Sequence, residues 1–398
     1  MGSPRNRVQR VKCELTNQGG NRLICPPTHD AAPLRLRSSL LPVATNQPKI
    51  TPSGGSASGA NILAGIDLST IGEPTVKAKG YWEQVWTRFR RDRVAIAGGI
   101  VVVLLFLFSF VAAPIAAQLL GHGPNDIYSS TGGLNAQQLP WGPWTHFQSL
   151  PYPGAVGHFH RVFFILGSDG QLGRDEFLRL LYGGQASLEV SIGATIFSLV
   201  LGVTLGSIAG FFGGWVDMVV SRATELVMAF PLILFIIALA STVGPTLNNI
   251  TLGFLGNGVF TLTVVLSVFG WFYPARIVRA QVLSLREKEF VEAARMVGSS
   301  DARIIRSHLL PHLVAPVIVL FTIFVAQTVL AEAGLSFLGV GIQAPTPSWG
   351  TLLSEAPQYY LAQPWLMLWP GLAVLITTLS FNLLGDGLRD ALDPRASR

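Results

Sequence analysis

The sequence predicts an all-α membrane protein with six transmembrane helices. Of its 398 residues, 49% are hydrophobic and only 13% are charged, and the mean hydropathy is +0.46. That composition is too apolar for an ordinary soluble domain. Six apolar stretches are each near the ~20 residues that cross a ~30 Å hydrocarbon core. They cover residues 94–117, 187–211, 225–243, 258–278, 310–332 and 366–386.

The segment before these stretches has a different composition. Residues 1–75 are rich in Gly, Ser, Pro, Asn and Thr and show no sustained apolar period. We expect a disordered cytoplasmic tail. We expect no cleavable signal peptide, because the segment lacks the continuous apolar region that a signal peptide requires. Cys13 and Cys25 lie in this tail without CxxC spacing. They are expected to be free thiols, so the sequence assigns no metal site.

Residues 76–93 lead into the first span. Between Tyr81 and Arg93 the sequence YWEQVWTRFRRDR places aromatic residues at helical spacing beside several arginines. This pattern is typical of an amphipathic helix that lies in the lipid interface. The first transmembrane helix is then expected at 94–117.

The positive charges indicate the orientation of the chain. Arginines precede the first span, and seven Lys or Arg residues crowd the loop between spans four and five, whereas residues 333–367 contain none. Since cytoplasmic loops carry the excess of Lys and Arg, both termini are expected in the cytoplasm. The net charge of +6 is therefore interpreted as a topology signal rather than as a nucleic-acid surface.

The rest of the chain divides at residue 187. Residues 118–186 form a long segment with scattered Pro, Gly, Trp and Tyr, expected to be an extracytoplasmic cap. Residues 187–395 hold the other five spans. Gly202, Gly206 and Gly210 fall on one face of the second span, where small residues let helix backbones pack closely.

The cytoplasmic stretch 276–311 is too polar to span and predicts two short helices broken at Gly298. Glu292, Ala293 and Ala294 form a slim surface that a partner can approach, and Lys288 is spaced to pair with Glu292. Gly298 suits a helix end. Ser299, Ser300 and Asp301 suit the start of the next helix.

These residues carry a family resemblance. Glu292-Ala293-Ala294, Gly298 and Leu310-Pro311 resemble the EAA loop of importer permeases of the ATP-binding-cassette class, although His308 stands where many families have an aliphatic residue. The resemblance to the dipeptide and oligopeptide permeases extends over about 163–395. Its further motifs are Leu166-Gly167-Ser168-Asp169, Gly173-Arg174-Asp175, Gly214-Trp215, Ala229-Phe230-Pro231 and residues 331–350 and 381–395.

The resemblance implies a type I importer permease fold in the inner membrane, with 187–395 as the permease core. It implies that Glu292, Ala293, Ala294, Gly298, Leu310 and Pro311 couple the chain to an ATPase. The implied partners are a second homologous permease, two ATPase subunits that bind ATP and Mg²⁺, an extracytoplasmic solute-binding protein and membrane lipid. This chain itself would bind no cofactor. A dipeptide or oligopeptide is the expected substrate, with nickel or another small solute as the alternative; the substrate-binding residues are unknown.

Two other classes of membrane protein have recognisable sequence patterns. A secondary transporter driven by an ion gradient is expected to show inverted repeats and broken helices with charged ligands at the midplane, which are not evident. An intramembrane enzyme is expected to show HExxH, GxSxG or paired aspartates, and the sequence contains none, so no catalytic residue is assigned. Glu189, Glu225 and Glu332 fall near predicted span ends and are expected at the interface.

Overall fold

The computed structural model describes residues 80–149, 160–231, 234, 236–238, 242 and 258–393. All of them belong to the unit Lys77–Arg398. The predicted tail 1–75 lies outside the described residues, and so do residues 232, 233, 235, 239–241 and 243 of the predicted third span, 225–243. Within the described part, five helices are long and apolar enough to cross a membrane. They are Arg93–Leu120, Glu176–Phe212, Val259–Arg286, Asp301–Phe337 and Trp365–Leu392.

Two helices precede the segment 121–175, at the positions expected for the interfacial helix and the first span. Helix α1 (Tyr81–Phe89) ends just before Asp92, whose carboxylate accepts hydrogen bonds from the amides of Val94 and Ala95 and so caps the next helix. That helix continues without a break through α2 (Arg93–Phe106), η3 (Leu107–Ala112) and α3 (Ala113–Leu120). The π-turn η3 comes just before Pro114, which has no amide hydrogen to continue the regular ladder.

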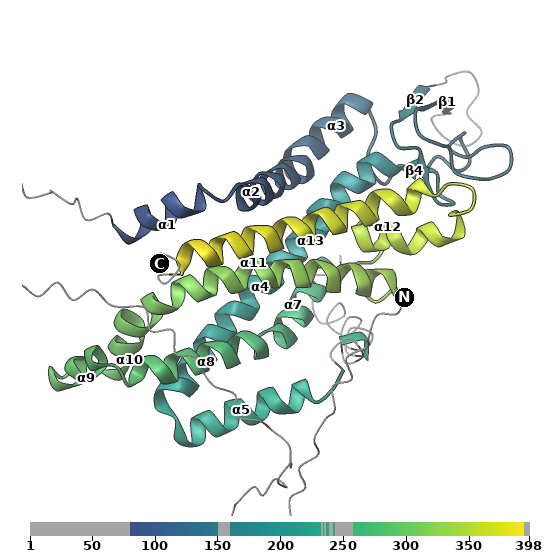
Figure 1. Ribbon diagram of the computed structural model, residues 1–398. Helices are drawn as coiled ribbons and strands as arrows, with labels where there is room; N and C mark the ends of the chain where they lie inside the picture. The colour runs from purple at the N-terminus through teal and green to yellow at the C-terminus, as the bar shows by residue number, and fades with distance from the viewer. Residues whose placement is uncertain are drawn as a thin grey trace, which may run out of the picture. The chain divides into compact units, whose positions relative to one another are not determined.

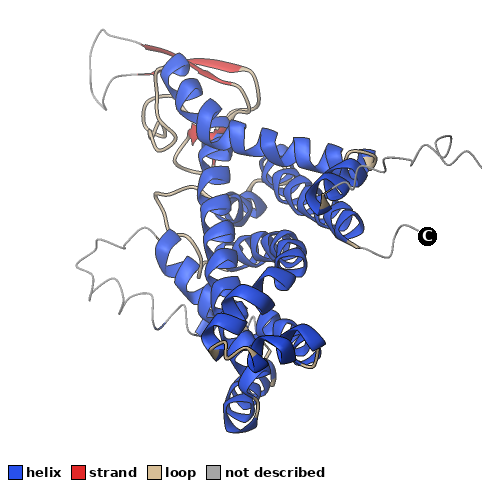
Figure 2. Ribbon diagram, turned by 90° about the vertical axis from the view of Figure 1, so that its left-hand side faces the viewer, coloured by secondary structure: helices blue, strands red, loops and turns tan. Residues whose placement is uncertain are grey.

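The segment between the first two spans contains a small β structure. Strand β1 (Thr145–Ser149) pairs antiparallel with β2 (His160–Phe164), and β3 (Ser168–Asp169) pairs with β4 (Arg174–Asp175). Phe147, Val162 and Phe164 form its buried core. Figure 2 shows these strands at one end of the helices.

Helix α4 (Glu176–Phe212) begins eleven residues before the predicted start of the second span at 187. Its 37 residues extend for ~55 Å, well beyond the hydrocarbon thickness. The early turns carry Glu176 and Arg179, which are buried against neighbouring segments. The prediction from long apolar stretches misses these turns, because their side chains are polar and are covered by protein rather than by lipid. Helix α5 (Gly214–Met228) follows after a turn at Gly213.

The remaining helices complete the bundle, and Figure 1 shows α11 and α13 side by side, with α4 crossing them. Helices α2, α4, α11, α12 and α13 share a core that includes Leu188, Val325, Val329 and Phe381. The bounds are α7 (Val259–Gly270), α8 (Phe272–Arg286), α9 (Glu289–Met296), α10 (Asp301–Ile304), η4 (Ile305–Leu309), α11 (Leu310–Phe337), α12 (Trp349–Glu355), η5 (Ala356–Gln358) and α13 (Trp365–Leu392).

The predicted glycine face of the second span is confirmed, and it packs against α8. A Cβ atom on Gly206 would lie 2.5 Å from the carbonyl oxygen of Ala275, and one on Gly210 would lie 2.8 Å from that of Arg279. Real Cβ atoms do not approach backbone oxygens this closely. The missing side chains therefore set the distance between α4 and α8.

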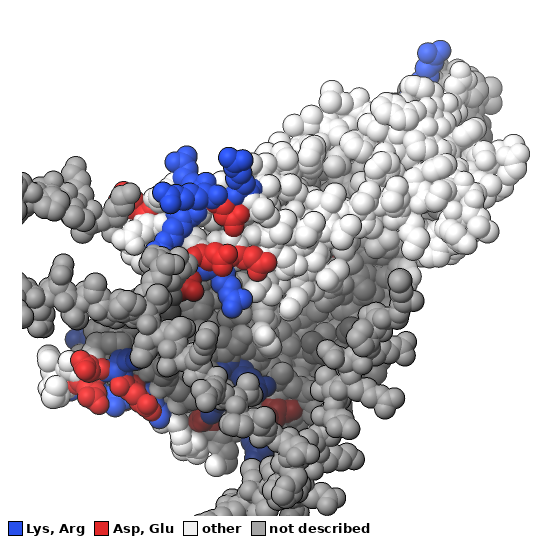
Figure 3. Space-filling model, in the orientation of Figure 1, with Lys and Arg blue, Asp and Glu red and all other residues white. Residues whose placement is uncertain are grey.

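Charged side chains are unevenly distributed over the face shown in Figure 3. Most blue and red residues gather at the end of the molecule that carries α1 and α9, while the surface over α2, α3 and α13 is almost free of charge. A lipid-facing surface requires this lack of charge. The charged end is the end that the sequence assigns to the cytoplasm.

Candidate functional site

The predicted coupling helix is α9, and one side of it is anchored to the bundle. Val291 is fully buried, and Phe290 and Ala294 pack beside it. This side belongs to a cluster, here called the loop core, that joins α4, α8, α9, η4 and α11. Its buried members are Phe211, Val278, Val282, Val291, Ile304, Leu309 and Leu313.

A complete Schellman motif ends α9 at the predicted position. Gly298 has φ +82°, in the left-handed region that side chains with a Cβ atom disfavour. The Ser299 amide donates to the Ala294 carbonyl at 3.0 Å, and the Gly298 amide donates to that of Arg295 at 2.9 Å. These bonds satisfy two carbonyls at the helix end and turn the chain sharply into α10, which Ser300 precedes as the N-cap residue.

The other side of α9 faces away from the bundle. Glu292 and Ala293 are exposed, and Met296 and Val297 are 84% and 86% exposed. Sequence reasoning did not single out Met296 and Val297. The sequence feature that could have identified them is a pair of large apolar residues next to Gly298 that fits no apolar periodicity. The helix therefore presents a mixed acidic and apolar tip.

The residues predicted at the end of the loop meet α9 only in part. Leu310 packs on the loop core, as Ala294 does, whereas Pro311 is exposed in the first turn of α11. The π-turn η4 comes just before Pro311 and accommodates its missing amide hydrogen. The ring of His312 stacks on Phe290 with centroids 5.1 Å apart, which ties α11 to α9. The expected ion pair between Lys288 and Glu292 is absent from the described structure.

Two arginines connect this loop to the spans. The Arg286 side chain donates to the carbonyl of Gly210 at 3.2 Å, at the end of α4. Arg279 donates to the Asp217 carboxylate at 2.6 Å and so joins α8 to α5. The hydrogen bond from Arg279 lowers the pKa of Asp217. The loop core therefore connects α9 to α4, and α8 connects the loop core to α5.

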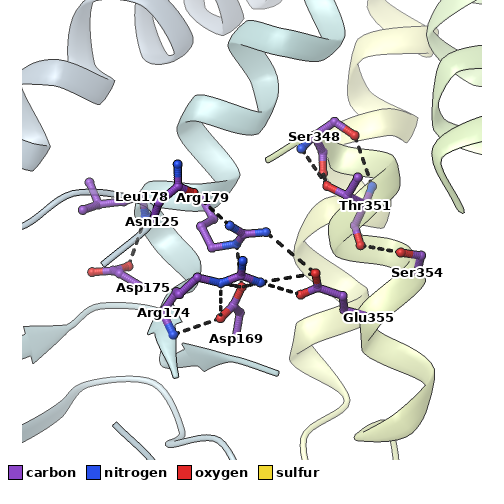
Figure 4. A network of polar contacts seen from close by, with 10 residues as sticks. All are labelled: Asn125, Asp169, Arg174, Asp175, Leu178, Arg179, Ser348, Thr351, Ser354 and Glu355. Carbon is purple, nitrogen blue, oxygen red and sulfur yellow. Dashed lines mark hydrogen bonds and ion pairs between the residues drawn. The ribbon is translucent and has the colours of Figure 1, made fainter. Parts of the chain in front are cut away.

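A second polar cluster lies at the opposite end of the bundle (Figure 4). Asp169 accepts from Arg174 at 2.9 Å and is paired with Arg179 at 2.5 Å, and Arg174 reaches Glu355 of α12 at 3.0 Å. The motif residues Asp169 and Arg174 thus bind α12 to the segment before α4. Both arginines are buried, and a buried arginine requires such carboxylate partners.

Glu332 corrects the expectation of an interfacial side chain. It is fully buried in α11, and its carboxylate accepts a hydrogen bond from the Ser336 hydroxyl at 2.8 Å. The chain beyond α11 turns back at Gly339, and the Ile342 amide donates to the same Ser336 oxygen. The returning segment covers Glu332. Sequence spacing placed this residue near a span end but did not show that the chain folds back over it.

Among the described residues, no cluster of three or more His, Cys, Asp or Glu side chains is arranged to hold a metal ion.

The chain matches two family models. Residues 202–398 match the binding-protein-dependent transport system inner membrane component, and residues 80–137 match the N-terminal TM domain of oligopeptide transport permease C.

Several named proteins are similar to this chain over most of their length. The dipeptide transport system permease protein DppC of Alkalihalophilus pseudofirmus is 37% identical, over 79% of this chain and 90% of that protein. The glutathione transport system permease protein GsiD of Pectobacterium atrosepticum is 34% identical, over 82% of this chain and 96% of that protein. The oligopeptide transport system permease protein OppC of Bacillus subtilis is 33% identical, over 80% of this chain and 91% of that protein. A solved inward-facing MetNI methionine ABC transporter chain is 18% identical, with a TM-score of 0.43 over 54% of this chain and 96% of that one.

Proposed function

We propose that this chain, which belongs to the family of binding-protein-dependent transport system inner membrane components, forms part of the membrane path of an importer of short peptides. The relatives named above transport dipeptides, oligopeptides and glutathione, which is itself a tripeptide. Peptide uptake is the chemistry that these three names share. The chain is a transport subunit, and ATP hydrolysis belongs to a separate subunit.

The complete importer in this proposal contains a second homologous permease, two ATPase subunits and an extracytoplasmic solute-binding protein. ATP and Mg²⁺ are bound by the ATPase subunits. The chain lies in the inner membrane with both termini in the cytoplasm. The Lys and Arg asymmetry of the loops supports this orientation, and so does the gathering of charge at the α1 and α9 end in Figure 3.

In this proposal α9 is the helix that seats in a groove of the ATPase. The observation that carries it is the two-sided character of α9, with Val291 fully buried and Met296 84% exposed. Glu292 and Ala293 lie on the side that the ATPase contacts. Ala294 and Leu310 hold the helix on the loop core. Gly298 ends α9, and Pro311 lies in the first turn of α11, the helix that receives the movement.

Two substitutions test this role. Gly298→Val places a β-branched residue at φ +82°, where the surrounding space is open, so the cost is conformational rather than steric. Ala294→Trp overfills the contact between α9 and the loop core. We expect both variants to reach the membrane at normal level and to pair with the second permease. We also expect them to recover less ATPase on purification and to fail to import a radiolabelled dipeptide.

The control is Ala302→Trp, an exposed position on α10 outside α9, which should import normally. Full uptake and normal ATPase recovery in both Gly298→Val and Ala294→Trp would show that α9 is not the coupling surface. Uptake by the unaltered importer that survives ATP depletion but stops with an uncoupler would indicate a secondary transporter instead.

A further inference from the structure

A cavity of about 400 Å³ lies between α5 and α8. Ser221, Thr224 and Glu225 line it from α5, and Arg276 and Arg279 line it from α8. The rest of its wall is apolar. The cavity is large enough for a small solute and has the mixture of apolar wall and few polar groups that binding sites show.

Two of the three charged side chains in the cavity already have partners. Arg279 makes its hydrogen bonds to Asp217 of α5. Glu225 pairs with Arg222 one turn away at 2.7 Å. Arg276 is exposed and makes no ion pair or side-chain hydrogen bond within the described part of the chain. The cavity therefore offers one guanidinium group whose donors are free.

The position of Arg276 in the bundle favours a polar environment. Its neighbour Ala275 packs on Gly202 and Gly206 of α4. Arg276 precedes Arg286, the last residue of α8, by ten residues, which corresponds to ~15 Å along the helix. Arg276 lies within Val259–Arg286, a helix long and apolar enough to span a membrane. In such a helix a cluster of charged and hydroxyl groups facing lipid is costly, whereas one facing a water-filled path is not. The cavity then belongs to the side of the chain that is turned away from lipid.

We propose that this cavity binds the carboxylate group of the transported solute during passage, with Arg276 as the contact. The proposal rests on the proposed function and names a substrate contact for it. A guanidinium group presents parallel donors that match a carboxylate in bidentate fashion. The free guanidinium group of Arg276 is therefore complementary to the carboxylate of a peptide.

A protection assay tests binding directly. In the assembled importer in nanodiscs, Cys13 and Cys25 are replaced by Ser, and Ser221→Cys places a thiol in the cavity wall. Dialanine should slow maleimide labelling of that thiol more than dialanine amide does. Adding Arg276→Gln should remove the difference between the two peptides. Equal protection by both peptides, or a difference that survives Arg276→Gln, would overturn the proposal.

An uptake assay in proteoliposomes provides the second measurement. Loss of one charge-assisted hydrogen-bonded contact predicts that Arg276→Gln lowers dipeptide uptake about tenfold, with Arg276→Lys in between. The control, Arg389→Gln, removes an exposed arginine of α13 outside the cavity and should behave as the unaltered importer. An importer that takes up no peptide even before substitution contradicts the proposed function. Peptide uptake that is equal with and without Arg276→Gln contradicts only the role of Arg276.

Two other sources of an anionic partner are separated by the same variants. If added anionic lipid slows labelling of the Ser221→Cys thiol and Arg276→Gln abolishes that effect, Arg276 binds lipid headgroups and the proposal is wrong. If Arg276→Gln lowers recovery of the second permease, the guanidinium pairs with that subunit and the proposal is equally wrong. Normal recovery together with carboxylate-dependent protection supports it.

Discussion

Asp217 and Arg279 form the closest polar connection between α5 and α8. Arg279 donates to both carboxylate oxygens, and this bidentate geometry is stronger than that of a single surface pair. The hydrogen bond from Arg279 holds the pKa of Asp217 below its ordinary value. Because the pKa is lowered in the folded state, the ion pair stabilises the fold above the ordinary aspartate pKa. That stability is lost only as the pH falls through the lowered value.

Asp217→Asn should therefore lower the Tm of the purified permease complex, and by the same amount at pH 5 and pH 7. Both values lie above the ordinary aspartate pKa of about 3.9, so the carboxylate is ionised at each. Thermal unfolding at the two pH values measures this. Glu225→Gln is the control, because its exposed pair with Arg222 should contribute almost nothing. A Tm difference for Asp217→Asn that shrinks between pH 7 and pH 5 would contradict the assignment.

Glu332 has a different role at the same scale. Its buried carboxylate and Ser336 hold the chain that returns from α11 toward α12. Gly350 lies against Ser336, where a Cβ atom would come within 2.5 Å of the serine Cβ. A single acidic residue is thus hydrogen-bonded to the serine at the centre of a close-packed turn.

At the level of elements, the contact between α4 and α8 depends on the absence of side chains. Gly206→Ala forces a Cβ atom against the Ala275 backbone, where no flexible side chain is available to move. Overpacking of this kind typically costs about 1–3 kcal/mol. We expect thermal unfolding to show a lower Tm of the permease complex. We also expect lower dipeptide uptake, because α9 is coupled less well to α4.

The matched control is Gly334→Ala, also in a helix, where an added Cβ atom meets nothing within 4 Å. Because Ala has the better helix propensity, this variant should be neutral or more stable by about 0.5–1 kcal/mol. Equal Tm values for the two variants would show that the contact between α4 and α8 is looser than the structure indicates.

Helix α12 is held at both ends by polar contacts. At its start, the Trp349 amide donates to the Ser187 hydroxyl of α4 at 3.2 Å, and at its end Glu355 meets Arg174. The short helix is therefore fixed to the segment around the start of α4. Seven residues could not maintain this position by helix propensity alone.

At the scale of the whole molecule, the proposed orientation places α10 in the cytoplasm and the turn before α13 outside. In a background with Cys13 and Cys25 replaced by Ser, Ser300→Cys and Ala362→Cys each introduce one exposed thiol. An impermeant maleimide on intact cells should label Ala362→Cys and not Ser300→Cys. Permeabilised cells serve as the control and should label both. The reverse pattern on intact cells would invert the orientation.

The sequence by itself determined the class of the protein and the local structure of its key loop. Apolar length identified the five spans that the described residues contain, because lipid demands continuous apolar surface whatever the tertiary packing. The break at Gly298 was predictable because a left-handed helix end depends on local backbone sterics. The family and the small-residue face of α4 were likewise readable from motif order and spacing.

Only the tertiary structure decided what depends on contacts between distant segments. It showed that α4 begins at Glu176, that Glu332 is buried, and that Glu355 pairs with Arg174 across 181 positions of sequence. It also divided α9 into an anchored side and an exposed tip, and it showed that Arg276 lines a cavity without an ion-pair partner among the described residues. Hydropathy records how polar a side chain is. Whether lipid, water or protein surrounds that side chain is fixed only when the helices pack.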